Sequence, residues 1–223
     1  MVGEKERAVG DDSGEIDNPF AADGRETRDD LRRAKRMAVL LTGARMINQR
    51  GYDRTTLDAI AAELDVSKRT LYYYIKNKDD ILFQCNTMAY EFLQPTLEVC
   101  ADPTIPPLRR IRTLMRAYAQ VLAQDFGACL VLIHENVLTR ESFAVLREIR
   151  RRMDMTLRAL IEAGIADGSI APCEPKFASA ALFGSFNWLP YWRAAGKTPS
   201  YEAVADAFLD VFFNGLRAEA DGG

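Results

Sequence analysis

The side chains best suited to chemistry in this sequence lie between residues 67 and 78, and the chemistry that they suit is recognition of nucleic acid. Lysine and arginine side chains that enter a major groove typically donate to guanine O6 and N7, and threonine can contact a thymine methyl group or a phosphate. A tyrosine beside them can project to the same surface. The candidate DNA contacts from this segment are Ser67, Lys68, Arg69, Thr70 and Tyr73.

Two short helices with a break between them would position these side chains. Thr56 can cap the first helix, and Ser67 can cap a second helix of about two turns that reaches Ile75. Within the second helix Leu71 points with Ile75 to one side, and the cationic and phenolic side chains point to the other. The pattern predicts a helix-turn-helix whose second helix enters the major groove. Apolar residues of the first helix fall at i, i+3, i+4 and i+7, and they are Leu57, Ile60, Ala61 and Leu64.

The charge of the chain is unevenly distributed. The formal net charge is -3 over 223 residues, and residues 25–90 hold 13 Lys and Arg against 9 Asp and Glu, a balance of +4 that leaves -7 elsewhere. The chain is therefore not a basic coat for nucleic acid, and DNA binding must come from one local patch. A hydrophobic content of 48% leaves room for buried helical cores.

Cysteine usage and hydropathy favour a cytoplasmic protein. The four cysteines are widely spaced without a C-x-x-C pair, so we expect reduced core residues. No apolar run approaches the ~18 residues of a membrane span, and the N-terminus has no apolar signal core. We therefore expect no membrane partner.

Several short stretches within about residues 34–82 match a known pattern. They are Gly51-Tyr52, Thr55-Thr56, Ile60-Ala61, Val66-Ser67-Lys68, Thr70-Leu71-Tyr72-Tyr73-Tyr74 and Lys76-Asn77-Lys78-Asp79-Asp80-Ile81-Leu82. On these residues the chain resembles the tetracycline-repressor (TetR) family of bacterial one-component transcription regulators. One departure is Arg69, where the family often has glycine. The resemblance implies phosphate contacts by Thr55, Thr56, Tyr72, Tyr74 and Lys78, with partial burial as the alternative for Tyr74.

The remainder of the chain predicts helices, so we expect an all-α protein of two helical domains. Residues 1–27 hold scattered glycines and acids, which predict a disordered tail. We expect residues 28–82 to form the DNA-binding domain and residues 83–223 to form a ligand-binding and dimerisation domain. Prolines at 103, 106 and 107 mark the start of a new unit. Helices are expected over about 28–50, 56–64, 67–75, from 78 onward, 108–123, 126–138, 140–167, 174–195 and 200–217.

The last two predicted helices indicate a homodimer interface over residues 174–217. Both are amphipathic, and two such helices at a C-terminus commonly pair with their symmetry mates in a four-helix bundle. The resemblance implies the same. One short helix reads only a few base pairs, so specific binding needs two copies about one DNA turn apart. We therefore expect a palindromic, inverted-repeat operator in double-stranded DNA. One face of the first of these helices carries Phe177, Ala180, Ala181, Gly184 and Trp188.

The larger domain lacks a catalytic or metal-binding pattern. His134 is the single histidine and has no second ligand at i+3 or i+4, so we expect no catalytic residue, no metal site and no cofactor. The aromatic side chains could instead line an apolar cavity, although packed core is the alternative for each one. The candidate ligand-binding residues are Tyr118, Phe126, His134, Arg150, Phe183, Trp188, Trp192 and Arg193.

The run from Ala181 to Arg193 resembles the C-terminal helix of TetR regulators that sense coenzyme A thioesters in steroid and fatty-acid catabolism. An acyl-CoA effector would need cations for its phosphates. Candidates for this role are Arg147, Arg150, Arg151, Arg158 and Arg193, and an exposed helix face is the alternative for Arg150, Arg151 and Arg152.

The sequence therefore favours a homodimeric transcription regulator without enzymatic activity, most simply a repressor released from its operator by a small hydrophobic effector. One alternative keeps DNA binding but makes the larger domain a module that only dimerises or binds a protein partner. A second alternative is a helical ligand-binding protein or enzyme whose first helices mimic the motif.

Overall fold

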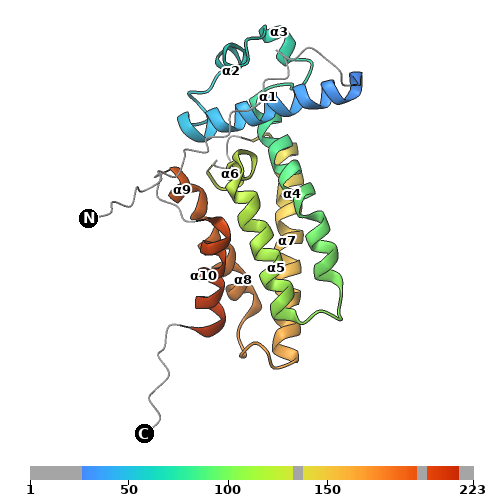
Figure 1. Cartoon of the computed structure of the whole chain (residues 1–223), viewed down its shortest axis with the longest axis vertical. Coiled ribbons are helices and arrows are strands. Elements are labelled where there is room, and N and C mark those ends of the chain that lie inside the picture. Colours follow the sequence, from blue (N-terminus) through green and yellow to red (C-terminus); the bar gives the residue numbers. More distant parts are fainter. Residues whose placement is uncertain (1–26, 133–137, 195–199, 216–223) are drawn as a thin grey trace, which may run out of the picture.

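The computed structural model describes residues 27–132, 138–194 and 200–215, and the regular elements in these ranges are all α-helices (Figure 1). The all-α prediction is confirmed. The tail predicted over residues 1–27 lies outside the described residues, apart from Thr27. In chain order the helices are α1 (Arg28–Arg50), α2 (Leu57–Glu63), α3 (Lys68–Leu71), α4 (Lys78–Ala101), α5 (Pro107–Ala123), α6 (Asp125–Leu132), α7 (Arg140–Ala166), α8 (Pro175–Phe186), α9 (Leu189–Ala194) and α10 (Tyr201–Asn214).

Local signals in the sequence set the ends of the first three helices. Thr27 caps α1 by accepting a backbone N–H of its first turn, and Gly51 ends the helix at a φ of 88° that glycine adopts without strain. Thr56 caps α2 and Ser67 caps α3 in the same way, as predicted. Asp65 has a φ of 53°, a left-handed conformation that aspartate adopts more readily than most residues, and it turns the chain between α2 and α3.

These three helices and the start of α4 share one apolar core. Leu71 is 0% exposed and Ile75 is 2% exposed, so the predicted inward face of the second short helix is confirmed. The other large side chains of this core include Leu40, Ile47, Ile60, Ile81 and Leu82. Burial of about 25 cal/mol for each Å² of apolar surface holds the short helices, which are too short to be stable alone.

The second short helix is shorter than predicted. We expected it to reach Ile75, whereas α3 ends at Leu71. Beyond this point the hydrogen bonds tighten to the i→i+3 type, from Tyr73 N–H to Thr70 O and from Tyr74 N–H to Leu71 O. Such tightening satisfies carbonyl groups that the end of an α-helix leaves without partners. The segment stays coiled, but its last residues have a different rotation about the axis.

The larger unit is a helical bundle in which α5 packs against α4, α6, α7 and α10 (Figure 1). Its core includes Ile111, Leu114 and Leu122 on α5, all of them 0% exposed. α4 belongs to both cores, because Ile81 packs in the first and Leu93 in the second. A displacement of α4 would therefore be felt in both units.

The helix predicted over residues 174–195 is two helices. α8 ends at Phe186, and α9 starts at Leu189 with Pro190 in its first turn. Proline lacks the N–H that would bond to the carbonyl of Phe186, and its ring would clash with that carbonyl in a continuous helix. The prediction overlooked this proline, and the chain bends at Asn187.

Two other helix ends differ from the predictions. α10 ends at Asn214, three residues before the predicted end, because Gly215 has a φ of 74°. α6 is described from Asp125 to Leu132, and the rest of the helix predicted to 138 falls on residues 133–137, outside the described ranges. In the described part of the chain, no helix combines the length and apolar character needed to cross a membrane.

Candidate functional site

The predicted DNA-reading face of α3 is exposed. Lys68 and Arg69 lie at its surface, and the Tyr72 and Tyr73 residues are 53% and 69% exposed. Large aromatic side chains are costly to leave in water unless a partner covers them. Since Leu71 anchors the opposite side, the arrangement presents a cationic and phenolic surface on a firmly held helix.

Contacts within the motif orient several of the predicted DNA-binding residues. Lys68 Nζ donates to Asp58 Oδ2 at 2.8 Å, and this hydrogen bond raises the pKa of Lys68, so the lysine stays charged. The pair is exposed and stabilises the fold little, which leaves Lys68 able to move to a DNA acceptor. Ser67 Oγ accepts from Thr70 N–H at 3.1 Å and lies 2.8 Å from Thr70 Oγ1.

The two adjacent threonines before α2 have different roles. Thr55 is 0% exposed, and its hydroxyl lies 3.2 Å from Met46 O and 3.0 Å from Gly51 O, so it holds the end of α1. A phosphate contact by this hydroxyl does not fit such burial, although Thr55 is among the residues that line the groove beside α3. Thr56 is exposed and accepts from Ala59 N–H at 3.1 Å, while its own hydroxyl hydrogen can still turn outward.

One shallow groove beside α3, of about 520 Å³, gathers several of the predicted phosphate contacts, and we call it the Lys78 groove. Lys78 Nζ donates to Tyr52 O at 2.6 Å and stands 4.1 Å from the centre of the Tyr52 ring. Lys78 is thus fixed at the wall of the groove as a positioned cation. The groove is also lined by Thr56, Lys68 and Tyr72.

A second groove, of about 400 Å³, lies against α1, and we call it the α1 groove. The basic cluster of α1 could have been only a solvated face, yet three of its arginines lie here with Tyr73 and the half-buried Tyr74. Arg36 is held in place, since its Nε donates to Gln84 Oε1 at 2.8 Å. The residues that line the α1 groove are Asp29, Arg32, Arg33, Arg36, Tyr73 and Tyr74.

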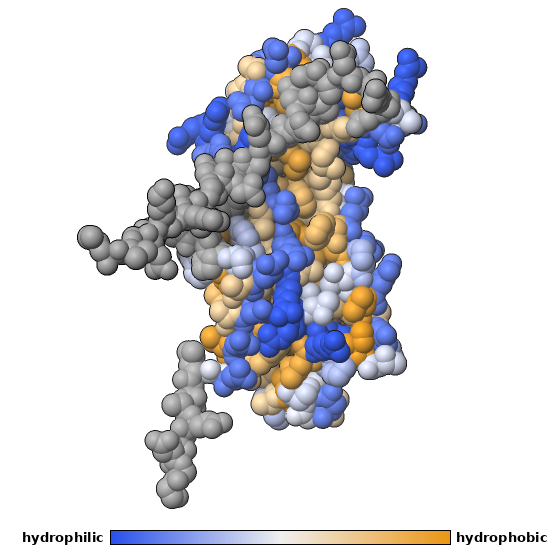
Figure 2. Space-filling model, viewed as in Figure 1, coloured by the Kyte–Doolittle hydropathy of each residue, from blue (hydrophilic) through white to orange (hydrophobic). Residues whose placement is uncertain are grey.

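Neighbouring tyrosines at the end of α3 line different grooves. Tyr72 lines the Lys78 groove, and Tyr73 lines the α1 groove. A helix in a major groove lies between two phosphate backbones, and cations on both sides of it suit that geometry. Figure 2 shows hydrophilic side chains at the edges of this end of the molecule, and others along the bundle.

Polar contacts connect the helix-turn-helix to the bundle at two places. Asp79, in the first turn of α4, accepts from Thr139 N–H at 2.9 Å and from Ser142 Oγ at 2.8 Å at the start of α7. On another side, Asn48 Nδ2 of α1 donates to Asp125 O of α6 at 2.8 Å. Both α6 and α7 therefore touch the DNA-binding unit directly.

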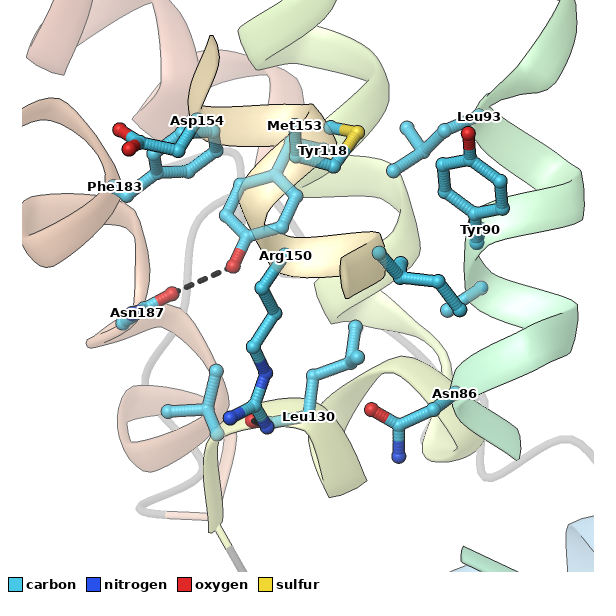
Figure 3. Close-up of a pocket in the computed structure, with 13 residues that line it drawn as sticks. Asn86, Tyr90, Leu93, Tyr118, Leu130, Arg150, Met153, Asp154, Phe183 and Asn187 are labelled. Carbon is cyan, nitrogen blue, oxygen red and sulfur yellow. Dashed lines mark hydrogen bonds between the residues drawn. The ribbon is translucent and has the colours of Figure 1, made fainter. Parts of the chain in front are cut away.

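The bundle holds a partly open cavity of about 480 Å³ between α4, α5, α6, α7 and α8 (Figure 3). Most of its lining is apolar, with a few polar groups at defined positions. Tyr118 Oη donates to Asn187 Oδ1 at 2.7 Å, and burial raises the pKa of Tyr118, so the phenol stays neutral. The lining residues are Asn86, Ala89, Tyr90, Leu93, Tyr118, Leu130, Val131, Ile149, Arg150, Met153, Asp154, Phe183 and Asn187.

The cavity gathers three of the predicted ligand-binding residues, which are Tyr118, Arg150 and Phe183. The rings of Tyr118 and Phe183 meet edge to face with centroids 5.2 Å apart. Sequence reasoning missed the wall formed by α4, although Asn86, Tyr90 and Leu93 follow the spacing of one helix face.

The other predicted ligand-binding residues are not gathered there. Phe126 packs between the two cores, and Trp188 and Trp192 are 58% and 42% exposed on the outside of the bundle. These three residues are not among those lining the cavity. His134 lies outside the described residues, as does the side chain of Arg193.

The arginines proposed for coenzyme A phosphates have separate environments. Arg151 and Arg152 are exposed and both donate to Glu148, at 3.0 and 3.2 Å, and this lowers the pKa of the glutamate. Arg158 pairs with Asp154 of its own helix. Of the arginines on α7, Arg150 lines the cavity.

An apolar face is exposed on α8, α9 and α10. Phe177 is 70% exposed and Trp188 is 58% exposed, and Gly184 between them has open space in front of it. α10 contributes Val211 and Phe212 at 45% and 38% exposure. Large exposed apolar side chains of this kind are typical of an interaction site, and these lie on the helices expected to pair with a second copy.

The described residues hold no group of three or more histidine, cysteine or acidic side chains that could bind a metal ion. The cysteines are free, and Cys85, Cys100 and Cys129 are buried whereas Cys173 is exposed. Burial raises the pKa of Cys100, and the Cys85 thiol together with burial raises that of Cys129, so these thiols stay protonated.

Family models match both parts of the chain. The model described as bacterial regulatory proteins of the tetR family matches residues 39–85. The model described as the tetracyclin repressor-like C-terminal domain matches residues 104–216, about half of the chain. α2 and α3 lie within the first match, and α5 to α10 lie within the second.

Individual proteins resemble the chain over most of its length. YhgD of Bacillus subtilis (strain 168), a helix-turn-helix transcriptional regulator without an assigned role, is 22% identical and covers 82% of this chain and 97% of its own. The fatty acid metabolism regulator protein of the same organism is 21% identical over 83% of this chain and 97% of its own.

Among solved structures, the crystal structure of AibR in complex with isovaleryl coenzyme A and operator DNA is similar throughout. It is 25% identical, covers 80% of this chain and 97% of its own, and superimposes with a TM-score of 0.70.

Proposed function

The chain belongs to the TetR family of bacterial regulatory proteins, and we propose that it is a homodimeric repressor that binds an inverted-repeat operator through α2 and α3. The observation that carries this proposal is the exposed α3 between two grooves lined by cations. The contacts proposed are Thr56, Ser67, Lys68, Arg69, Thr70, Tyr72, Tyr73, Tyr74 and Lys78.

Dimerisation supplies the specificity that one short helix lacks. We propose the exposed face of α8, α9 and α10 as the interface, within the residues 174–217 expected from the sequence, because Phe177, Trp188 and Phe212 would be buried there. Two recognition helices about 34 Å apart would read two half-sites on one side of the DNA.

The effector is proposed to bind in the cavity between α4, α5, α6, α7 and α8. Its apolar lining with Arg150, Tyr118 and Asn187 suits a small hydrophobic molecule with a polar end. AibR is described with isovaleryl coenzyme A, which supports an acyl-CoA thioester as the class to test first. The effector must bind the DNA-free state more tightly than the DNA-bound state in order to release the operator.

We propose that the protein acts as a regulator and not as an enzyme. Its proposed location is the cytoplasm, because it must reach the DNA there. The core domains proposed for it are the helix-turn-helix of residues 28–82 and the sensing and dimerisation domain of residues 83–223.

Titration of the full chain against the DNA upstream of its own gene tests the proposal. We expect tight binding to an inverted repeat with an affinity that falls steeply with salt, and a scrambled repeat is the control. Isovaleryl coenzyme A should raise the melting temperature and release the DNA. Failure to bind any inverted repeat would contradict DNA recognition. Binding that no acyl-CoA alters would instead favour a larger domain that only dimerises or binds a protein.

A further inference from the structure

Arg150 joins the cavity to α6. It is the cationic residue among those lining the cavity, and its Nη2 donates to Leu130 O at 3.3 Å. In Figure 3 the guanidinium lies beside Leu130, while Leu93 and Met153 lie at the other end of the view. The cavity therefore has a cationic end at α6, while its other end, along α4 and α7, holds Leu93 and Met153 beside Tyr90 and Asp154.

The acidic residue of the lining already has partners. Asp154 forms an ion pair with Arg158 and accepts from Ser179 Oγ at 2.7 Å. The cavity lining also offers neutral hydrogen-bonding groups, which include the phenol of Tyr118 and the amide of Asn187. A charged ligand group at this end of the cavity would gain most by being an anion, because a guanidinium binds a carboxylate or phosphate oxygen more strongly than a neutral carbonyl.

α6 carries this contact to the DNA-binding unit. The described part of this helix, Asp125–Leu132, packs against α1, α4 and α5. At its start, Asp125 O accepts from Asn48 Nδ2 of α1, and Cys129 Sγ lies 3.3 Å from Asn48 Oδ1. The α1 helix in turn supplies much of the core behind α3.

We propose that the effector carries an anionic group that binds Arg150, and that this group draws the guanidinium away from Leu130 O and loosens α6 against α1. This proposal rests on the proposed function and names the chemical group that triggers release of the operator. The apolar body of the effector lies toward Leu93 and Met153. The anion is either a carboxylate on the apolar body itself or a phosphate of a coenzyme A thioester.

Matched probes test the charge requirement on the full-length protein bound to its operator. Octanoate and isovalerate supply a carboxylate, isovaleryl coenzyme A supplies phosphates, and octanamide and isovaleramide are the neutral controls. We expect the anions of one source to release the DNA at concentrations at least about tenfold lower than the matched amide. Release by amides and acids alike, or no release by either anion source, would overturn the proposal.

Two substitutions at position 150 separate a binding role from a structural one. Arg150→Gln should raise the concentration of the effective anion needed for release by about tenfold or more and abolish the preference for acid over amide, and Arg150→Lys should retain that preference. Arg151→Gln is the matched control, because Arg151 is exposed and pairs with Glu148. Unchanged selectivity in Arg150→Gln would overturn the proposal, and if that variant does not fold, the Arg150→Lys variant and the probe series decide.

The same measurements distinguish an error in the proposed function from an error in the proposed role of Arg150. If the wild-type protein does not bind an inverted repeat, the proposed function is wrong. If it binds and is released equally by charged and neutral probes, only the role of Arg150 is wrong.

Discussion

Arg69 is exposed at the start of α3. A long cation there can reach a base edge, whereas Lys78 is held at a groove wall by Tyr52. We therefore propose base reading by Arg69 and backbone contact by Lys78.

We expect Arg69→Ala to change which operator bases are preferred, because a bidentate arginine–guanine contact gives about 1–3 kcal/mol of discrimination. Lys78→Ala should weaken all operators evenly and lower the salt slope by about one unit, because one phosphate would no longer be neutralised. Titration of an operator library across salt measures both effects. The roles are wrong if the two variants behave alike.

Thr55 illustrates how burial changes the role of a residue whose type suits DNA contact. Thr55→Val keeps the size of the side chain but removes a buried hydroxyl that bonds to two carbonyls, so we expect a decrease of about 1–3 kcal/mol in the free energy of unfolding. Urea unfolding measures this decrease, and Thr55→Ser, which keeps the hydroxyl, should restore most of it. If Thr55→Val instead lowers the salt slope of operator binding by a full unit, Thr55 contacts a phosphate and its role is not only structural.

At the scale of elements, α1 is both a core helix and part of the DNA-facing surface. Its buried face includes Val39 and Ile47, and its first turns place arginines in the α1 groove. One helix can serve in the core and at the DNA-facing surface because its 3.6-residue period places the two sets of side chains on different faces.

Arg32→Ala combined with Arg33→Ala should lower the salt slope of operator binding by about one unit for each phosphate that these arginines neutralise, without changing base preference. Fluorescence anisotropy at several salt concentrations measures the slope. Arg109→Ala is the control, since Arg109 is exposed on α5 in the other unit. An unchanged slope in the double variant would mean that the α1 arginines are only a solvated face.

At the scale of the whole molecule, the aromatic face of α8, α9 and α10 is unpartnered in one copy of the chain. The rings of Trp188 and Tyr191 contact each other at a tilt with centroids 5.4 Å apart, and both remain exposed. A second copy related by a twofold axis would cover this surface and set the distance between the two α3 helices.

Trp188→Ala combined with Phe212→Ala should shift the protein toward monomers, because large aromatics at the centre of an interface commonly contribute about 2 kcal/mol or more each. Sedimentation velocity measures the shift, and operator affinity should fall with it. Phe92→Ala, which changes a 50% exposed residue of α4, is the control. A double variant that remains dimeric would place the interface elsewhere.

Local patterns predicted much of the fold because helix ends and helix faces depend on nearby residues. Caps at Thr56 and Ser67 and the inward face of Leu71 and Ile75 followed from spacing alone. The bend at Asn187 was also readable from Pro190, but the apolar pattern across it concealed the break.

The sequence by itself therefore determined that this chain is an all-α member of its family with a helix-turn-helix whose cationic face is exposed. Only the tertiary structure decided that Thr55 is buried, that the α1 arginines lie beside Tyr73, and that Arg150 enters the cavity while Trp188 and Trp192 stay outside. The reason is physical: periodicity fixes which side of a helix a residue occupies, whereas the neighbour that covers that side comes from a distant part of the chain.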